Sequence, residues 1–172
     1  MPDNPRVSCR RGTPPPRVVV ADDSAEMSGM LALMLASRGF DVVVAPDGDA
    51  ALNAILSDGA DGLVSDFQMP GLDGLTLCRI LRGLRAYATL PIVIFTGIED
   101  RDPRLLPLRD IDELRILHKP MGLREIAPAL IEMIPTNVTG IASSSPSSTR
   151  RVRGRDVATR PRRSAARWES LV

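Results

Sequence analysis

Residues 17–24, which read Arg-Val-Val-Val-Ala-Asp-Asp-Ser, contain the pattern that decides the fold. A continuous run of β-branched residues is typical of a strand that is buried on both faces of a parallel sheet. The run ends in two aspartates, and Ser24 can cap a helix whose apolar residues recur at helical spacing from Met27 through Met30 to Leu35. The stretch therefore predicts a strand, an acidic strand end and a helix that ends at Gly39.

Four more apolar runs follow, and helical patterns separate most of them. We expect strands at residues 41–45, 62–66, 91–96 and 115–118, and helices at residues 50–57, 75–85 and 123–134. Repeated βα units favour right-handed crossovers, with helices on both faces of the sheet. The predicted fold is α/β, a flavodoxin-like doubly wound sheet of five parallel strands in the order 2-1-3-4-5.

Three prolines predict irregular helices in the second half of the chain. Pro103 and Pro107 lie between the fourth and fifth strands and would interrupt a helix there. Pro128 falls inside the last predicted helix and should kink that helix or delay its start.

Charge is unevenly distributed along the 172 residues. Residues 1–17 carry a net +3 and residues 136–172 a net +6, and because the whole chain is +1, residues 18–135 hold −8. We expect a disordered Pro/Arg-rich leader over residues 1–16, one folded domain over residues 17–135, and a Ser/Thr linker with a disordered Arg-rich tail over residues 136–172. An acidic body does not bind nucleic acid by charge, so such a role would fall to the tail.

Apolar runs are too short to indicate a membrane protein. No run approaches the roughly 18 residues that a membrane-spanning helix needs, and the first thirty residues lack the apolar centre of a signal peptide. We therefore expect a cytoplasmic protein without a membrane partner. Cys9 and Cys78 lie in unlike settings, which indicates no disulfide framework, and Cys78 is predicted to be a small core residue.

Acidic, hydroxyl and basic side chains lie at the ends of the predicted strands. Asp22 and Asp23 follow the first strand, Asp66 ends the third, Thr96 ends the fourth and Lys119 follows the fifth. Ligand sites of this fold class lie beyond the carboxyl ends of the strands, so we expect these side chains to converge. Three carboxylates repel one another, and a hard divalent cation, preferably Mg²⁺, would neutralise them through oxygen ligands. A carboxylate held against Mg²⁺ can attack a phosphoryl group.

Lys119 is the only lysine among 22 basic residues. A compact ammonium on a flexible stem reaches a single phosphoryl oxygen in a way that the planar fork of arginine does not. We therefore expect Lys119 to pair with one phosphoryl oxygen and the Thr96 hydroxyl to bond to another. Taken alone, Lys119 is equally well read as a surface lysine after a strand. His118, the sole histidine, is expected to be a packed or exposed bystander.

Five motifs in this order resemble the receiver domain of two-component response regulators, over about residues 17–135. They are Val20–Ser24, Val44–Leu52, Ser65–Gly74, Phe95–Gly97 and His118–Pro120. The resemblance implies a sensor histidine kinase or a phosphotransfer protein as the phosphodonor. It also implies a signalling phosphoacceptor rather than an enzyme, apart from Mg²⁺-dependent self-phosphorylation from a phosphodonor.

The resemblance assigns a role to each residue at the strand ends. It implies that Asp66 is the phosphoacceptor, that Asp23 is a direct Mg²⁺ ligand, and that Asp22 acts largely through water. The backbone carbonyl of Gln68 would also bind the metal. By the same resemblance Thr96 is the switch hydroxyl, and Lys119 binds the phosphoryl group before a proline whose peptide bond is usually cis.

Three hypotheses of function stay open, and departures from the family pattern bear on the second of them. Ile116 stands where the family usually carries Tyr or Phe, and Gly97 where it favours Ala. The leading hypothesis is a stand-alone receiver that is phosphorylated on Asp66 and acts through protein contacts. The second is a receiver-shaped scaffold that does not switch, which Ile116 and the prolines favour. The third is sequence-blind nucleic-acid binding by the eight arginines of residues 150–172.

Overall fold

The computed structural model describes residues 14–135, so most of the expected leader and the whole of the expected linker and tail lie outside the described residues. Five parallel strands form one sheet in the order β2-β1-β3-β4-β5. The strands are β1 (Arg17–Ala21), β2 (Asp41–Ala45), β3 (Gly62–Ser65), β4 (Ile92–Thr96) and β5 (Leu114–His118). This order confirms the predicted doubly wound sheet.

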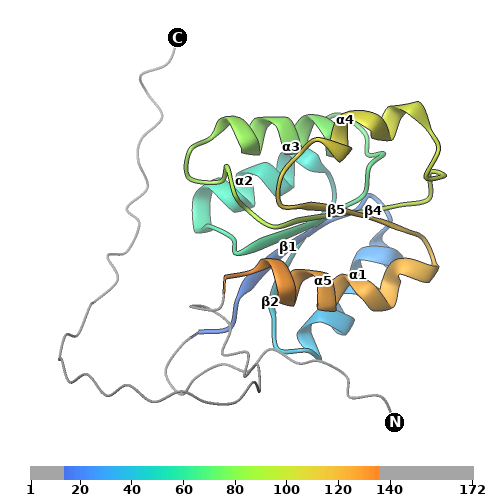
Figure 1. Ribbon diagram of the computed structural model, residues 1–172. Helices are drawn as coiled ribbons and strands as arrows, with labels where there is room; N and C mark the ends of the chain where they lie inside the picture. The colour runs from blue at the N-terminus through green and yellow to red at the C-terminus, as the bar shows by residue number, and fades with distance from the viewer. Residues whose placement is uncertain (1–13, 136–172) are drawn as a thin grey trace, which may run out of the picture. The chain divides into compact units, whose positions relative to one another are not determined.

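Helices cover both faces of the sheet (Figure 1). On one face lie α1 (Ala25–Ala36) and α5 (Ile126–Met133), and on the other lie α2 (Gly48–Asp58), α3 (Gly74–Gly83) and α4 (Leu106–Arg109). Successive side chains of a strand point to opposite faces, so the sheet contributes to an apolar core on each face. In β1, Val18 and Val20 face α1 and α5, while Val19 faces α2 and α3. All three valines are fully buried, and each contributes about 1.5–3 kcal/mol by leaving water.

Prolines shorten the fourth and fifth helical segments, as the sequence predicted. A 3₁₀ turn over Pro103–Leu105 leads into α4, which is only four residues long and carries Pro107 in its first turn. A second 3₁₀ turn, Met121–Glu125, precedes α5, whose third residue is Pro128. The N–H groups of a helix's first turn have no acceptor within the helix, so a proline there costs no hydrogen bond and Pro128 is tolerated. The α-helical part accordingly begins at Ile126 rather than at Leu123.

Two details of α1 differ from the sequence prediction. Ser24 caps the helix as expected, since its side chain accepts a hydrogen bond from the N–H of Met27. The helix nevertheless ends at Ala36, before Gly39, which lies in the following turn with φ +95°. Met30, assigned to the buried face, is 42% exposed. The reason is that apolar residues surround α1, so hydrophobic spacing alone does not define its inner face.

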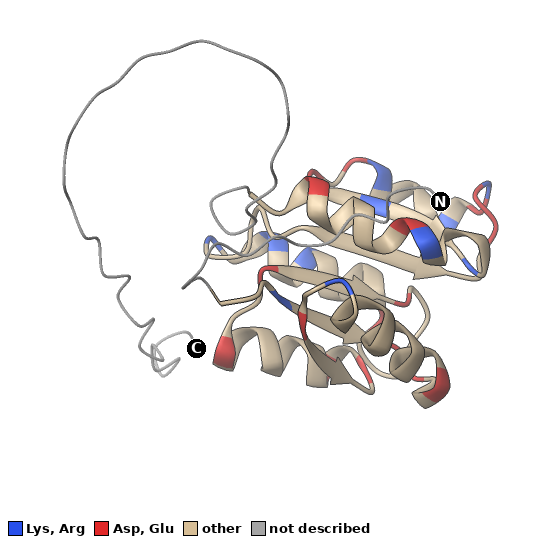
Figure 2. Cartoon of the chain, turned by 90° about the horizontal axis from the view of Figure 1, so that it is seen from below, with Lys and Arg blue, Asp and Glu red and all other residues tan. Residues whose placement is uncertain are grey.

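Cys78 lies in the core of α3 and is fully buried, as predicted. Burial raises the pKa of its thiol to about 12, which keeps the group protonated and unreactive. Charged residues, by contrast, gather in the loops and at the helix ends, while the strands are mostly uncharged (Figure 2). Within residues 14–135, no helix combines the length and the apolar character that crossing a membrane requires.

Arg82, near the end of α3, joins the segments that precede β4 and β5. Its Nη1 donates to the carbonyl of Tyr87 at 3.2 Å, and its Nη2 donates to the carbonyls of Leu90 and Asp112 at 2.9 Å each. A planar guanidinium can serve several carbonyls at once, whereas a lysine ammonium at the same place cannot reach all of them. Arg82 therefore holds the segments that enter β4 and β5, at the amino ends of these strands, whereas the acidic residues lie at the carboxyl ends.

We expect Arg82→Lys to lower the free energy of unfolding by about 1–3 kcal/mol, because the partly buried carbonyls of Tyr87 and Leu90 lose their donor. Urea unfolding of the full chain measures the change. Arg79→Lys is the matched control, since Arg79 is exposed on the same helix, and it should stay within about 0.5 kcal/mol of the parent protein. Equal stability of the two variants would contradict this role for Arg82.

Candidate functional site

Three carboxylates converge at the carboxyl ends of β1 and β3, which are neighbours in the sheet. Asp22, Asp23 and Asp66 each offer an oxygen, and these oxygens lie within 4.8 Å of one another. The side chain of Asp22 is only 2% exposed and that of Asp66 13%, whereas Asp23 is exposed. Like charges at this spacing raise each other's energy, so the cluster is a place where positive charge is strongly stabilised.

Lys119, which directly follows β5, brings positive charge to this cluster. Its Nζ lies 2.9 Å from Oδ2 of Asp22 and 2.8 Å from Oδ2 of Asp66. Burial alone would lower the pKa of Lys119, but the hydrogen bonds and charges of Asp66 and Asp22 outweigh it and raise the pKa above its ordinary value. The ammonium therefore stays charged at neutral pH.

The backbone around Lys119 places its side chain. The Lys119–Pro120 peptide bond is cis, and the N–H of Lys119 donates to the carbonyl of Thr96 at 2.8 Å. Nζ also lies 5.6 Å from the ring centroid of Phe95, within the range of a cation–π contact. The structure thus ties Lys119 to the end of β4 through its backbone and to the acidic cluster through its side chain.

Asp66 is held by the loop that follows it. Its Oδ1 accepts a hydrogen bond from the N–H of Phe67 at 2.6 Å, and its own N–H donates to the carbonyl of Ala21 at 2.8 Å. Gly74 closes the loop: its N–H donates to the carbonyl of Phe67 at 3.0 Å, and a Cβ there would lie 2.4 Å from the carbonyl oxygen of Asp66. Only a glycine allows α3 to start this close to the backbone of Asp66.

Asp22 and Gln68 are positioned by local backbone hydrogen bonds. Oδ1 of Asp22 accepts from the N–H of Ser24 at 2.9 Å, so the N-terminus of α1 lies directly beside the acidic cluster. The N–H of Gln68 lies 3.4 Å from Oδ1 of Asp66. The metal-binding role of the Gln68 carbonyl stays a prediction.

Thr96 ends β4 and is 1% exposed. Its hydroxyl oxygen accepts a hydrogen bond from the N–H of Ile98 at 3.2 Å, and its carbonyl accepts from Lys119. The structure therefore places Thr96 next to Lys119 at the same edge of the sheet, with its hydroxyl bonded to the loop after β4.

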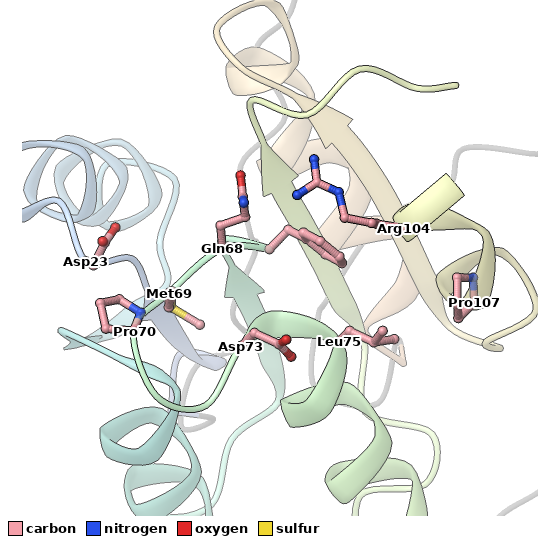
Figure 3. A pocket seen from close by; sticks show the side chains of 9 residues that line it. Asp23, Gln68, Met69, Pro70, Asp73, Leu75, Arg104 and Pro107 are labelled. Carbon is pink, nitrogen blue, oxygen red and sulfur yellow. The ribbon is translucent and has the colours of Figure 1, made fainter. Parts of the chain in front are cut away.

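An open hollow of about 600 Å³ lies beside Asp23 and Gln68. Arg104 and Pro107 form its opposite wall, and the side chains of Gln68 and Arg104 extend in the same direction from its two sides (Figure 3). Arg104 bonds to Asp102 at 2.7 Å, and this hydrogen bond lowers the pKa of Asp102 to about 2. Sequence reasoning missed Arg104, because no periodicity places the loop after β4 against the loop after β3.

His118, expected to be a packed or exposed bystander, is half-buried and lies close to the loop after β4. Its Nδ1 lies 2.7 Å from the carbonyl oxygen of Ile98, and the side chain is 35% exposed. The histidine thus contacts the same residue that binds the Thr96 hydroxyl.

The family model of the response regulator receiver domain matches residues 18–131. The chain is 35% identical over 123 residues to the alkaline phosphatase synthesis transcriptional regulatory protein SphR of Synechococcus elongatus. The matched region covers 66% of this chain and 47% of SphR. It is also 39% identical over 110 residues to the response regulator MprA of Mycobacterium tuberculosis, and this matched region covers 64% of this chain and 46% of MprA. The chain therefore spans about half the length of these relatives.

A solved structure has the same fold. The receiver domain of the Francisella response regulator 1452 matches with a TM-score of 0.62 and 28% sequence identity, over 69% of this chain and 96% of that domain.

We expect Gly74→Ala to destabilise the protein by about 1–3 kcal/mol, because the added methyl group meets the backbone of Asp66. Urea unfolding measures this loss. The matched control is Gly83→Ala at the other end of α3, where an added Cβ meets nothing within 4 Å. That variant should be unchanged or up to about 1 kcal/mol more stable, and a loss as large as that of Gly74→Ala would refute the close-packing argument.

Proposed function

The chain belongs to the response regulator receiver family, and from this membership we propose that it accepts a phosphoryl group on Asp66 from a sensor histidine kinase or a phosphotransfer protein. We propose that it then signals through protein contacts, from the cytoplasm, with residues 17–135 as the receiver. The observation that carries the proposal is the pairing of Lys119 with both Asp22 and Asp66 inside a cluster of three carboxylates.

The donor atoms of the cluster suit Mg²⁺. Carboxylate oxygens are the ligands that a hard divalent cation prefers, and those of Asp22, Asp23 and Asp66 lie within 4.8 Å of one another. We propose that these three residues and the backbone carbonyl of Gln68 hold the ion. When bound, Mg²⁺ supplies positive charge that stabilises a phosphoryl group during its transfer.

In the proposed reaction Asp66 is the nucleophile. One of its carboxylate oxygens would form a bond to phosphorus while the bond from phosphorus to the imidazole nitrogen of the donor breaks and leaves its electron pair on that nitrogen. The N–H of Phe67, 2.6 Å from Oδ1, fixes the orientation of the carboxylate before the transfer. A carboxylate attacks without the help of a general base, and the ammonium of Lys119 lies 2.8 Å from Oδ2 of Asp66.

Lys119 and Thr96 would bind the transferred group. Lys119 bonds to Oδ2 of Asp66 at rest, so its ammonium lies next to the position that a phosphoryl oxygen would take. The Thr96 hydroxyl accepts from Ile98 at rest and still has a proton to donate to a second phosphoryl oxygen. Both contacts strengthen as negative charge gathers on the phosphoryl group.

A scaffold that does not switch is the second candidate. Ile116 is half-buried against the core that lies beneath α2, α3 and α4, and its side chain has no hydrogen-bonding group. Together with the short α4, this favours a receiver whose output surface does not respond to phosphorylation. Nucleic-acid binding would depend on residues 150–172, which lie outside the described residues.

We expect Asp66→Asn to abolish phosphoryl uptake, because the amide is a poor nucleophile of nearly the same shape. Intact mass after incubation with acetyl phosphate and Mg²⁺ measures uptake in the full chain. The parent protein and Asp49→Asn, which removes an equal but exposed charge, should each gain one phosphoryl group. A parent protein without any gain would favour the scaffold, and uptake by Asp66→Asn would refute the assigned phosphoacceptor.

We expect Lys119→Arg to lower the rate of uptake about tenfold or more, because the fork cannot place one compact donor between Asp22 and Asp66. The rate follows from intact mass against time. Arg115→Lys makes the reverse exchange on β5, the strand just before Lys119, at an exposed pair with Glu132, and should leave the rate unchanged. An equal rate in Lys119→Arg would mean that only its charge matters.

A further inference from the structure

His118 ends β5 directly beside Thr96, which ends β4, and the two residues are paired in the register of the sheet. Nδ1 of His118 lies 2.7 Å from the carbonyl oxygen of Ile98. A carbonyl only accepts hydrogen bonds, so in this geometry Nδ1 must carry a proton and donate it. The imidazole therefore ties the strand end of β5 to the loop after β4.

Ile98 connects this histidine to the Thr96 hydroxyl. The N–H of Ile98 donates to Oγ1 of Thr96 at 3.2 Å, while the carbonyl of Ile98 accepts from His118. The Ile98 side chain is 7% exposed and packs in the core beneath α2 and α3. A bond that fixes Ile98 therefore also fixes the N–H group that donates to the Thr96 hydroxyl oxygen at rest.

A second contact of His118 is weaker. Its Nε2 lies 3.5 Å from Oδ1 of Asp100, which in turn bonds to Arg109 of α4 at 2.9 Å. The side chains of Asp100 and Arg109 are 67% and 46% exposed, and ion pairs of such exposure contribute little. The hydrogen bond from Nδ1 is therefore the contact that matters.

We propose that His118 is a positioning residue that holds the loop after β4, and through Ile98 the Thr96 hydroxyl, in the resting arrangement. The inference rests on the role proposed above for Thr96. Movement of the loop toward a phosphoryl group on Asp66 would stretch or break the bond from His118 to Ile98, because His118 is fixed at the end of β5. The histidine thereby stabilises the unphosphorylated arrangement and slows phosphoryl uptake, because this bond favours one of the two arrangements of the loop.

Three substitutions separate the hydrogen bond from the bulk of the ring. His118→Asn keeps a donor near the place of Nδ1, His118→Gln moves the amide toward the place of Nε2, and His118→Leu has no donor. Initial rates of uptake from acetyl phosphate, measured by intact mass on the full chain, should rise about threefold to tenfold in His118→Leu and His118→Gln. His118→Asn should keep the parent rate. The proposal fails if all three variants share one rate or if His118→Asn behaves like His118→Leu.

A second measurement does not depend on phosphoryl uptake. His118 is the only histidine in the chain, so nitrogen-15 NMR of histidine-labelled protein shows a single imidazole. We expect the proton of the neutral imidazole on Nδ1, because the carbonyl of Ile98 accepts from that nitrogen. The amide proton of Ile98 should exchange faster in His118→Leu than in His118→Asn.

A proton on Nε2 instead, or equal exchange at Ile98 in both variants, would overturn the positioning role. If the parent protein takes up no phosphoryl group, the proposed function fails, while this measurement still decides the role of His118.

Discussion

Repulsion among three carboxylates is the constraint on which the arrangement of this protein depends. A parallel sheet brings its strand ends to one edge, and here that edge carries Asp22, Asp23 and Asp66 within 4.8 Å of one another. Burial makes the repulsion stronger, since Asp22 is 2% exposed. The domain tolerates the cluster because Lys119 bonds to two of its members. We propose that this site, with its three carboxylates and the Lys119 ammonium, binds a metal ion and a phosphoryl group.

The surrounding structure serves to keep these groups at fixed distances. β1 is buried along most of its length, so the position of Asp22 is set by packing on both faces of the sheet. Gly74 lets α3 begin against the backbone of Asp66, and Ser24 begins α1 beside Asp22. The loop after β4 contains only short helical turns, because prolines interrupt it, but Ile98 and Leu105 still anchor it in the core. Packing of the strands and of the two helix starts thus fixes the acidic groups, and burial fixes Thr96, which is 1% exposed.

Sequence patterns predicted the strands well and the helix ends less well, for physical reasons. β1, β2 and β4 each contain a run of four apolar residues with no competing helical period. In contrast, α2 begins at Gly48, before the predicted Ala50, because Asp47 caps it through a local hydrogen bond. The strand-end rule also anticipated the meeting of Asp22 and Asp66 with Lys119. Arg104 and the contact of His118 escaped prediction, because both depend on the path of residues 97–105, which no periodic pattern determines.

Paramagnetic broadening by Mn²⁺ tests most directly whether the acidic cluster holds a divalent cation. Mn²⁺ would be added in small amounts to nitrogen-15-labelled full chain, and the loss of amide signals followed by NMR. We expect amides near Asp23 and Asp66 to broaden first and to recover on addition of Mg²⁺, while those of Asp112 and Glu113, just before the start of β5 and far from the acidic cluster, persist. Broadening that begins elsewhere, or that Mg²⁺ does not reverse, would show that the three carboxylates do not form the cation site.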